Sequence, residues 1–198
     1  EVTDHGDVAI VIPERPADPS DDPKYLPETV ASSKNIVEAV AGLLRSEQIP
    51  VILGGDHSIA IGTFSAMAMN ARESGKDIGL IWFDAHADIN TPETSPTGNI
   101  HGMPLAVILG EGPEELTSIG GFAPKLNRDY FAHVGARDLD LGERSRVLGL
   151  RLRDRFFTMS DIDKRGMRTV MEEALSIVGR APGGFAVTFD IDAIDPTF

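Results

Sequence analysis

The sequence predicts an α/β fold in which helices cover both faces of a mainly parallel sheet. Short apolar runs alternate along the chain with segments of helical spacing, and this order implies βαβ units with right-handed crossovers. The apolar run at residues 78–83 is continuous rather than alternating, which is typical of a strand buried on both faces. Polar residues directly follow several of the runs, where parallel sheets bind their ligands. A chain of 198 residues is long enough for one such domain.

The N-terminal part is expected to hold two helices. Residues 30–48 have helical spacing, because their apolar residues fall on one face: Ile36, Val37, Val40, Leu43 and Leu44. Residues 59–72 predict a second helix. The apolar runs at 8–12 and 51–53 are short strand candidates, and the Pro- and Asp-rich stretch at 13–27 predicts a surface loop.

The C-terminal part continues the alternation of strands and helices. Apolar runs predict strands at 78–83, 130–134, 156–159 and 185–189. Helical spacing predicts helices at 141–150 and 164–178. The stretch at 110–124 is expected to be a second long loop.

Composition excludes several classes of protein. The absence of cysteine rules out disulfides, thiolate metal sites and a cysteine nucleophile. The formal charge of −13 disfavours nonspecific nucleic-acid binding, because such a surface repels phosphates. No apolar stretch approaches the roughly 18 residues of a membrane helix, and no secretion signal opens the chain. We therefore expect a cytoplasmic protein with no nucleic-acid partner and no membrane partner.

Polar clusters follow four of the predicted strands. Because the strands are expected to be parallel, their carboxyl ends bring these clusters to one edge of the sheet. The clusters are Asp56 and His57 after 51–53, then Asp84, His86 and Asp88 after 81–83, then Arg137, Asp138 and Asp140 after 133–135, and finally Asp190 and Asp192 after 187–189. This edge is the predicted functional site.

The densest cluster, Asp84-Ala85-His86-Ala87-Asp88, favours a metal site. Its polar residues at i, i+2 and i+4 project to one side of an extended backbone, and the small alanines leave room for close approach. Carboxylates in contact repel one another by roughly 4 kcal/mol at an effective dielectric near 20, so a positive group is expected beside them. No lysine or arginine occurs between residues 78 and 108, which leaves a metal ion as the better partner.

The predicted ligand set indicates two metal ions. It consists of four aspartates and two histidines, namely His57, Asp84, His86, Asp88, Asp190 and Asp192. Oxygen and imidazole ligands without thiolate favour Mn²⁺ or a similar divalent ion over a structural Zn²⁺. Four carboxylates carry a charge of −4, which balances two divalent ions and would overcharge one.

Structural interpretations of the single motifs stay open. Gly54-Gly55-Asp56-His57 also fits a strand-to-helix turn, and Asp190-Ile191-Asp192 also fits a strand-end cap. Asp195 is expected to be structural, because Asp-Pro commonly starts a turn. The occurrence of all these motifs at successive strand ends is what favours the metal interpretation.

The motifs together resemble the ureohydrolase family, which contains the arginases and agmatinases. The matching strings are Gly54-Gly55-Asp56-His57-Ser58, Asp84-Ala85-His86-Ala87-Asp88, His101-Gly102-Met103-Pro104 and Asp190-Ile191-Asp192-Ala193-Ile194-Asp195-Pro196. The resemblance implies a single domain over residues 1–198, built as a three-layer α/β/α sandwich with two Mn²⁺ ions. It assigns His57 and Asp88 to one ion, His86 and Asp192 to the other, and Asp84 and Asp190 to both as bridging ligands.

The loops around the ligands resemble arginases more than agmatinases, through Asp88-Ile89-Asn90-Thr91-Pro92. The resemblance implies that Asn90, Thr97 and Asn99 bind the carboxylate end of L-arginine, and that Asp140 and Glu143 bind its α-amino group. Amide and hydroxyl groups suit a carboxylate, and acidic groups suit an ammonium.

The reaction implied by the resemblance is the hydrolysis of L-arginine to L-ornithine and urea. Two metal ions lower the pKa of a bridging water, which attacks the guanidinium carbon as hydroxide. The expected catalytic residues are His101 and Asp88, and His101 relays a proton to the leaving nitrogen. Agmatine or another guanidino compound is the alternative substrate.

The chain is expected to be a truncated part of a longer protein, because it starts without methionine and ends at an Asp-Pro motif after which arginases continue. In the family, the continuing part supplies a glutamate for the substrate guanidinium and much of the subunit contact. The resemblance implies a homo-oligomer, a trimer or hexamer, for the full-length protein. A metal-binding but catalytically inert chain is therefore a further alternative.

Overall fold

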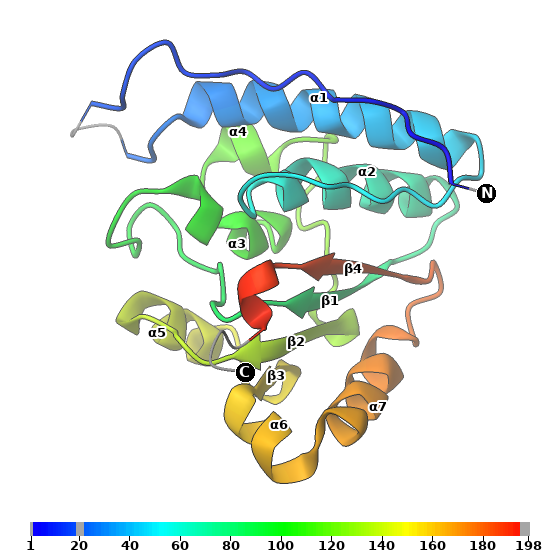
Figure 1. Cartoon of the computed structure of the whole chain (residues 1–198), viewed down its shortest axis with the longest axis vertical. Coiled ribbons are helices and arrows are strands. Elements are labelled where there is room, and N and C mark those ends of the chain that lie inside the picture. The colour runs from blue at the N-terminus through cyan, green and yellow to red at the C-terminus, as the bar shows by residue number, and fades with distance from the viewer. Residues whose placement is uncertain (1, 19–21, 195–198) are drawn as a thin grey trace.

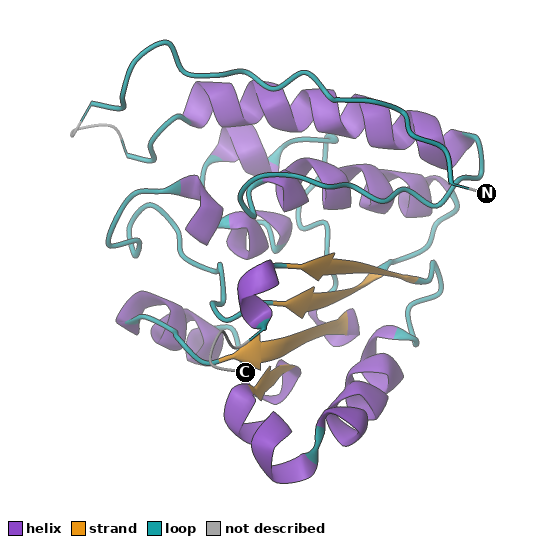
Figure 2. Cartoon of the chain, in the orientation of Figure 1, coloured by secondary structure: helices purple, strands orange, loops and turns teal. Residues whose placement is uncertain are grey.

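The computed structural model describes residues 2–18 and 22–194, and it confirms the predicted parallel sheet (Figure 1; Figure 2). The strands are β1 (Gly79–Phe83), β2 (Phe131–Ala136), β3 (Phe156–Thr158) and β4 (Phe185–Phe189). They pair in the order β3-β2-β1-β4, and every pairing is parallel. Their carboxyl ends therefore lie at one edge of the sheet.

Helices lie on both sides of this sheet, so the fold has the predicted three layers (Figure 1). One side carries α1 (Leu26–Arg45), α2 (Ile59–Glu73), α3 (Pro104–Ile108) and α4 (Glu114–Thr117). The other side carries α6 (Met159–Arg165) and α7 (Met167–Val178). Helix α5 (Leu141–Gly149) follows the carboxyl end of β2. Short 3-10 helices occupy Ile100–Gly102, Arg128–Tyr130, Arg153–Arg155 and Ile191–Ala193.

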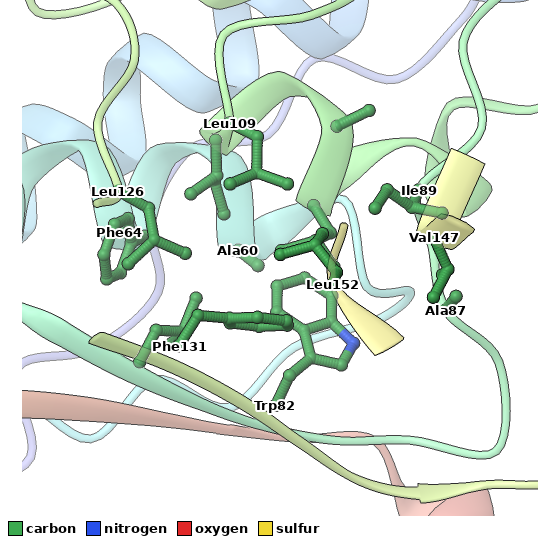
Figure 3. Close-up of a cluster of buried hydrophobic side chains, with 14 of the residues drawn as sticks. Ala60, Phe64, Trp82, Ala87, Ile89, Leu109, Leu126, Phe131, Val147 and Leu152 are labelled. Atoms are coloured by element: carbon green, nitrogen blue, oxygen red, sulfur yellow. The ribbon is translucent and has the colours of Figure 1, made fainter. Parts of the chain in front are cut away.

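The two faces of β1 bury different parts of the core. Leu80 and Trp82 belong to the larger cluster, where Trp82 lies near Phe131 and below the helices of the first side (Figure 3). Ile81 belongs to the second cluster, together with Val170 of α7. Because side chains alternate across a strand, a continuous apolar run supplies both clusters, as the sequence predicts.

The strands predicted at 8–12 and 51–53 are wrong. The first segment instead lies against α1, where the Val11 backbone N–H donates to Ser32 Oγ and Asn35 Nδ2 donates to the Ala9 carbonyl. Val51 is 81% exposed in the second segment. A strand needs a neighbour that satisfies its backbone hydrogen bonds. Neither segment pairs with a strand among the described residues, where β4 is the last strand of the sheet on this side.

The remaining predicted strands and helices are confirmed with small shifts, except for the helix predicted at 164–178. The helix predicted at 164–178 is interrupted, because Gly166 adopts φ +80°, which is a left-handed conformation. An additional helix, α6, begins earlier, where Thr158 and Asp161 form a reciprocal capping box. The loop predicted at 110–124 contains α4. No described helix combines the length and the apolar character that a membrane span requires.

Candidate metal centre

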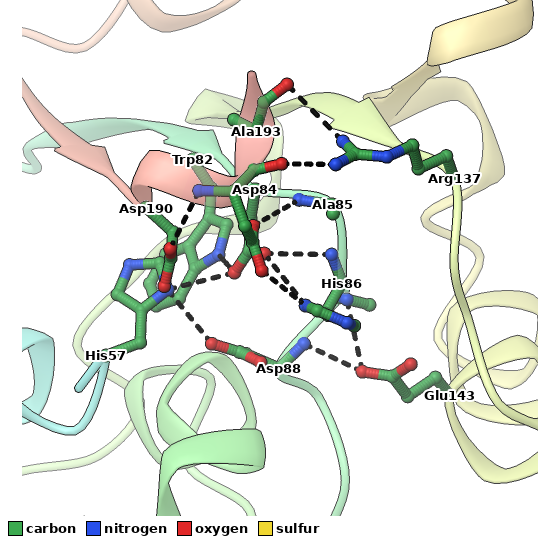
Figure 4. Close-up of polar contacts among 12 residues, drawn as sticks. His57, Trp82, Asp84, Ala85, His86, Asp88, Arg137, Glu143, Asp190 and Ala193 are labelled. Carbon is green, nitrogen blue, oxygen red and sulfur yellow. Dashed lines mark hydrogen bonds and ion pairs between the residues drawn. The ribbon is translucent and has the colours of Figure 1, made fainter. Parts of the chain in front are cut away.

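The carboxyl ends of β1 and β4 and the start of α2 surround a cavity of about 410 Å³. All six predicted ligands line it, namely His57, Asp84, His86, Asp88, Asp190 and Asp192. Figure 4 shows the side chains of His57, His86, Asp88 and Asp190 around Asp84. One detail of the prediction is corrected: His57 comes from the loop before α2 and not from the end of a strand, since residues 51–53 form no strand.

The first group of ligand atoms surrounds the ring of His57. Its Nδ1 lies 2.9 Å from Asp84 Oδ2 and 3.0 Å from Asp88 Oδ2. All three residues are buried, and their ligand atoms are close enough to hold one metal ion. Asp190 Oδ2 lies 3.6 Å from the same nitrogen, so this carboxylate borders the first group.

The second group lies on the opposite side of Asp84 and is more exposed. His86 Nδ1 is 3.1 Å from Asp192 Oδ2 and 3.4 Å from Asp84 Oδ1. These three residues could hold a second ion. Asp84 thus belongs to both groups and offers a different oxygen to each, which is the arrangement expected of a bridging carboxylate.

Two residues that the sequence analysis missed orient the first group. The Nε2 atom of His57 is 2.7 Å from Thr188 Oγ1, so the imidazole is held from the side opposite its Nδ1. Trp82 stacks on the same imidazole at 4.1 Å, and its Nε1–H donates to Asp84 Oδ2 at 3.1 Å. A signal for each exists in the sequence. Thr188 shares a strand face with Asp190, and a buried tryptophan N–H requires an acceptor.

His133 is a third residue that the sequence analysis did not single out. It lies on β2, is fully buried, stacks on Phe156 at 4.5 Å and donates its Nε2–H to the His86 carbonyl at 2.6 Å. Burial lowers the pKa of His133 to about 4, so the ring is neutral. It therefore fixes the backbone at a predicted ligand without adding charge to the site.

Histidine and carboxylate side chains shift one another's pKa in the first group. Burial opposes the charged form of His57, but hydrogen bonds to Asp84 and Asp88 outweigh it and raise the pKa of His57 to about 9. Burial also opposes ionisation of Asp84, but hydrogen bonds from His57, from the His86 backbone and from Trp82 hold its pKa well below the usual range. Asp84 is therefore a permanent anion at the centre of the site.

Asp88 and Asp192 have raised pKa values. Burial raises the pKa of Asp88 to about 7, and the negative charge of Asp84 adds to this effect against a hydrogen bond from His57. Burial and the charges of Asp84 and Asp190 raise the pKa of Asp192. Both carboxyl groups thus lie where further positive charge would stabilise their ionised forms.

The chemistry of this donor set fits divalent metal ions. Among the ion pairs of the described residues, the partners of the four clustered aspartates are His57 and His86, and no lysine or arginine side chain pairs with them. Arg137 comes near, but its guanidinium donates to the backbone carbonyls of Asp192 and Ala193. Carboxylate and imidazole donors without lysine or arginine partners suit a hard or borderline divalent ion.

The residues predicted to bind the α-amino end of the substrate lie beside the metal ligands. Asp140 and Glu143 line the cavity and form the capping box that begins α5. Asn90 is 4% exposed, and its Nδ2 donates to Asp140 Oδ2 at 2.8 Å. The Asn90 amide therefore holds Asp140 in place at the cavity wall.

The other predicted site residues are spread along the loop before α3. Thr97 and His101 are exposed and line the cavity. Asn99 is not part of the cavity lining, and its Oδ1 accepts from Lys24 Nζ at 3.5 Å.

Two further aspartates of the predicted polar clusters, Asp56 and Asp138, also line the cavity. Asp56 Oδ1 accepts a hydrogen bond from the Ser58 backbone N–H at 3.0 Å. Asp195 lies outside the described residues.

Fold and site together define an α/β protein with a candidate binuclear metal centre built on a parallel sheet. Comparison with known families gives a match to the Arginase family over residues 1–198. The chain therefore belongs to the arginase family, which confirms the predicted relationship.

Individual relatives agree with this assignment. The chain is 42% identical over 195 residues to an arginase of Brevibacillus brevis, a match that covers 98% of this chain and 63% of that protein. The crystal structure of the Bacillus subtilis arginase superposes with a TM-score of 0.88 at 39% identity, covering 98% of this chain and 63% of the other. A structure of Entamoeba histolytica arginase in complex with L-ornithine gives a TM-score of 0.83 at 34% identity, covering 96% and 62%. The chain thus spans 63% of the length of the curated Brevibacillus relative.

Proposed function

We propose that the chain hydrolyses L-arginine to L-ornithine and urea with the help of two Mn²⁺ ions. The observation that carries this proposal is the position of Asp84, whose two carboxylate oxygens face His57 and His86 respectively. One carboxylate shared by two imidazole–carboxylate groups would be suited to hold a pair of divalent ions. Membership of the arginase family supports the reaction.

Six side chains are proposed to hold the ions. His57 and Asp88 bind one, His86 and Asp192 bind the other, and Asp84 and Asp190 contribute to both. When bound, two divalent ions lower the pKa of a water molecule so that it attacks the guanidinium carbon as hydroxide at neutral pH. The four aspartates carry the negative charge that matches such a pair. Asp88, which lines the cavity, is also the proposed catalytic carboxylate.

His101 is proposed to deliver a proton to the nitrogen that leaves with ornithine. Its exposed side chain lines the same cavity as the metal ligands, which supports this role. An imidazole can accept a proton at one nitrogen and donate one from the other. The C–N bond then breaks with the electron pair passing to a protonated nitrogen.

The amino-acid end of the substrate is proposed to lie against the start of α5 and the loop before α3. Asp140 and Glu143 attract the α-amino group, and Asn90, Thr97 and Asn99 serve the carboxylate. The cavity lining supports all of these assignments except Asn99, which lies beside Lys24. The Entamoeba histolytica relative in complex with L-ornithine supports an amino-acid ligand of this type.

Two alternatives lead to different measurements. An agmatinase or another guanidino-compound hydrolase would use the same ions with a substrate that lacks the α-carboxylate. A chain that binds metal without turnover is the second alternative. A trimer or hexamer stays a proposal for the full-length protein.

Urea release after loading with MnCl₂ tests the proposal. We expect L-arginine to be preferred over agmatine by more than about tenfold in kcat/KM, a difference of about 1.4 kcal/mol in transition-state binding. A preference for agmatine would replace the proposed substrate. About two bound ions per chain with no urea from either compound would leave metal binding as the only function.

Single substitutions assign the roles within the site. His57→Ala is expected to lose one Mn²⁺ and Asp190→Ala to weaken both, and each variant should abolish urea release, because the proposed chemistry needs the pair of ions. His101→Ala should lower kcat by about 10²- to 10⁴-fold while metal content stays unchanged. His5→Ala, at an exposed histidine near the N-terminus, is the matched control. Near wild-type activity in both His57→Ala and Asp190→Ala would contradict the proposed mechanism.

A further inference from the structure

We propose that Glu143 is a positioning residue of the metal centre, whose carboxylate fixes the backbone turn that presents Asp88. This inference rests on the proposed metal site but not on the proposed reaction. It goes beyond the substrate role proposed for Glu143, because it predicts that this side chain affects Mn²⁺ affinity in the absence of substrate.

Asp88 needs support because of its backbone conformation. It has φ +51°, a left-handed conformation that a residue other than glycine seldom adopts. Such a conformation persists when surrounding contacts hold it. The position of the Asp88 side chain depends on this turn, which places its Oδ2 3.0 Å from His57 Nδ1 in the first ligand group.

Glu143 supplies contacts at the position where they are needed. Its Oε1 accepts hydrogen bonds from the backbone N–H groups of Ala87, at 3.1 Å, and of Asp88, at 2.9 Å. The side chain is 4% exposed, so solvent does not compete strongly for these donors. Hydrogen bonds to an ionised acceptor are roughly twice as strong as neutral ones. One buried carboxylate oxygen therefore joins α5 to the turn after β1 (Figure 4).

The second carboxylate oxygen fixes Glu143 itself. Oε2 accepts from the Asp140 backbone at 3.0 Å, and Asp140 Oδ1 accepts from the Glu143 backbone at 2.8 Å. Both oxygens thus accept hydrogen bonds from backbone N–H groups. The capping box of α5 consequently does two things, because it begins a helix and holds a ligand-bearing turn 55 residues away in sequence.

The contacts predict an unequal effect on the two ions. The group of His57, Asp84 and Asp88 contains the turn that Glu143 holds, whereas the group of Asp84, His86 and Asp192 does not contain Asp88. Removing a partner that orients a metal ligand typically lowers metal affinity about 10- to 100-fold. We expect Glu143→Ala to weaken one Mn²⁺ by this factor and to leave the other near its wild-type affinity.

The experiment titrates the metal-free protein with MnCl₂ alone and measures free Mn²⁺ by electron paramagnetic resonance. Asp161→Ala is the matched control, because Asp161 occupies the same third helical position in the capping box of α6, away from the cavity. It should leave both Mn²⁺ affinities unchanged. Melting curves of the metal-free variants report any loss of fold.

Glu143→Gln distinguishes positioning from charge. Its amide oxygen can still accept from the Ala87 and Asp88 N–H groups, so most of the lost affinity should return relative to Glu143→Ala. If Glu143 only attracts the substrate ammonium, both variants keep wild-type Mn²⁺ affinity and raise KM alike. That result would overturn the inference, and so would an equal loss of both ions in Glu143→Ala. If neither wild type nor any variant releases urea, the proposed function is contradicted. The Mn²⁺ titration still tests the role of Glu143, because it does not depend on activity.

Discussion

At the scale of single residues, the site depends on the side chains and backbone groups behind Asp84. The Trp82 N–H donates to Oδ2 of Asp84, and the His86 backbone N–H donates to Oδ1 at 2.8 Å. The His57 ring is held by stacking on Trp82 and by the contact of its Nε2 with Thr188 Oγ1. The two oxygens of Asp84 are therefore aimed at different histidines by groups that bear no charge.

Thr188 gives the clearest prediction at this scale. Thr188→Val keeps the shape of the side chain but removes the hydroxyl that lies 2.7 Å from His57 Nε2. We expect Mn²⁺ affinity to fall about 10- to 100-fold, because the imidazole loses the partner that orients it. Thr188→Ser, which retains the hydroxyl, should stay close to wild type in the same titration. Equal affinities in the valine and serine variants would show that the hydroxyl plays no part.

The sequence pattern predicts the ligands directly, whereas it gives only indirect signals for the residues that support them. Asp84, His86 and Asp88 stand out because alternate polar residues interrupt an apolar chain. Trp82 and Thr188 instead lie inside apolar runs, where the period of a strand explains them without any site. Glu143 was expected at the cavity, but its bonds to Ala87 and Asp88 depend on how α5 docks beside β1, which no local pattern encodes.

At the scale of elements, the contact between α1 and α2 depends on one glycine. A Cβ atom at Gly62 of α2 would lie 2.6 Å from the Ser33 carbonyl oxygen and 2.8 Å from Ile36 Cβ in α1. Both neighbours belong to a helix backbone or to the stem of a side chain, so neither moves easily. The close approach of these two helices therefore excludes any side chain at this position.

Gly62→Ala is thus expected to destabilise the protein, although alanine favours helices. Overpacking of this kind costs about 1–3 kcal/mol of unfolding free energy. Gly42→Ala in α1 is the matched control, since a Cβ there meets only Arg45 Nη2 at 4.0 Å. It should stabilise by about 0.5–1 kcal/mol through helix propensity. Urea denaturation measures both, and a stabilising Gly62→Ala would contradict the packing described for α1 and α2.

The elements show where sequence patterns suffice and where they fail. β1 and β2 could be predicted because both are buried on their two faces and require continuous apolar runs. The runs at 8–12 and 51–53 have similar composition but no strand beside them in the described sheet, so they remain extended loops. Strand formation depends on neighbours that are distant in sequence, and an apolar run alone does not supply them.

At the scale of the whole molecule, the buried Lys125, which does not line the cavity, makes the unfolding free energy depend on pH. Lys125 is 6% exposed, and its Nζ donates to the Thr117 and Phe122 carbonyls at 2.7 and 3.2 Å. Burial lowers the pKa of Lys125 to about 8. An unfolded chain keeps this proton up to about pH 10.4, the ordinary value for lysine. Between these values the unfolded state binds more protons, so Lys125 makes stability rise with pH.

Lys125→Met should remove this contribution. The unfolding free energy of wild type minus that of the variant is expected to grow by up to about 3 kcal/mol between pH 8 and roughly 10.5, since one pKa unit corresponds to about 1.4 kcal/mol. Lys76→Met, which removes an exposed positive charge nearby, controls for the change in net charge. A constant difference between wild type and Lys125→Met over this window would contradict the burial effect.

Metal binding would also affect the charge and the stability of the whole molecule. A net charge of −13 includes four aspartates gathered at one edge of the sheet, and two divalent ions would offset their charge. Ions that bind only the folded protein also stabilise it, by about 2.7 kcal/mol at a hundred times the dissociation constant. The same constellation thus links folding to the proposed chemistry.

The number of Mn²⁺ ions bound per chain tests this account most directly. Equilibrium dialysis against MnCl₂, followed by elemental analysis, is expected to give about two ions for wild type and for Asp163→Asn, a change on the exposed surface of α6. Asp84→Asn should lose most of both, because Asp84 belongs to both ligand groups. Equal metal contents in wild type and Asp84→Asn, or no bound Mn²⁺ in wild type, would contradict a binuclear centre at this position.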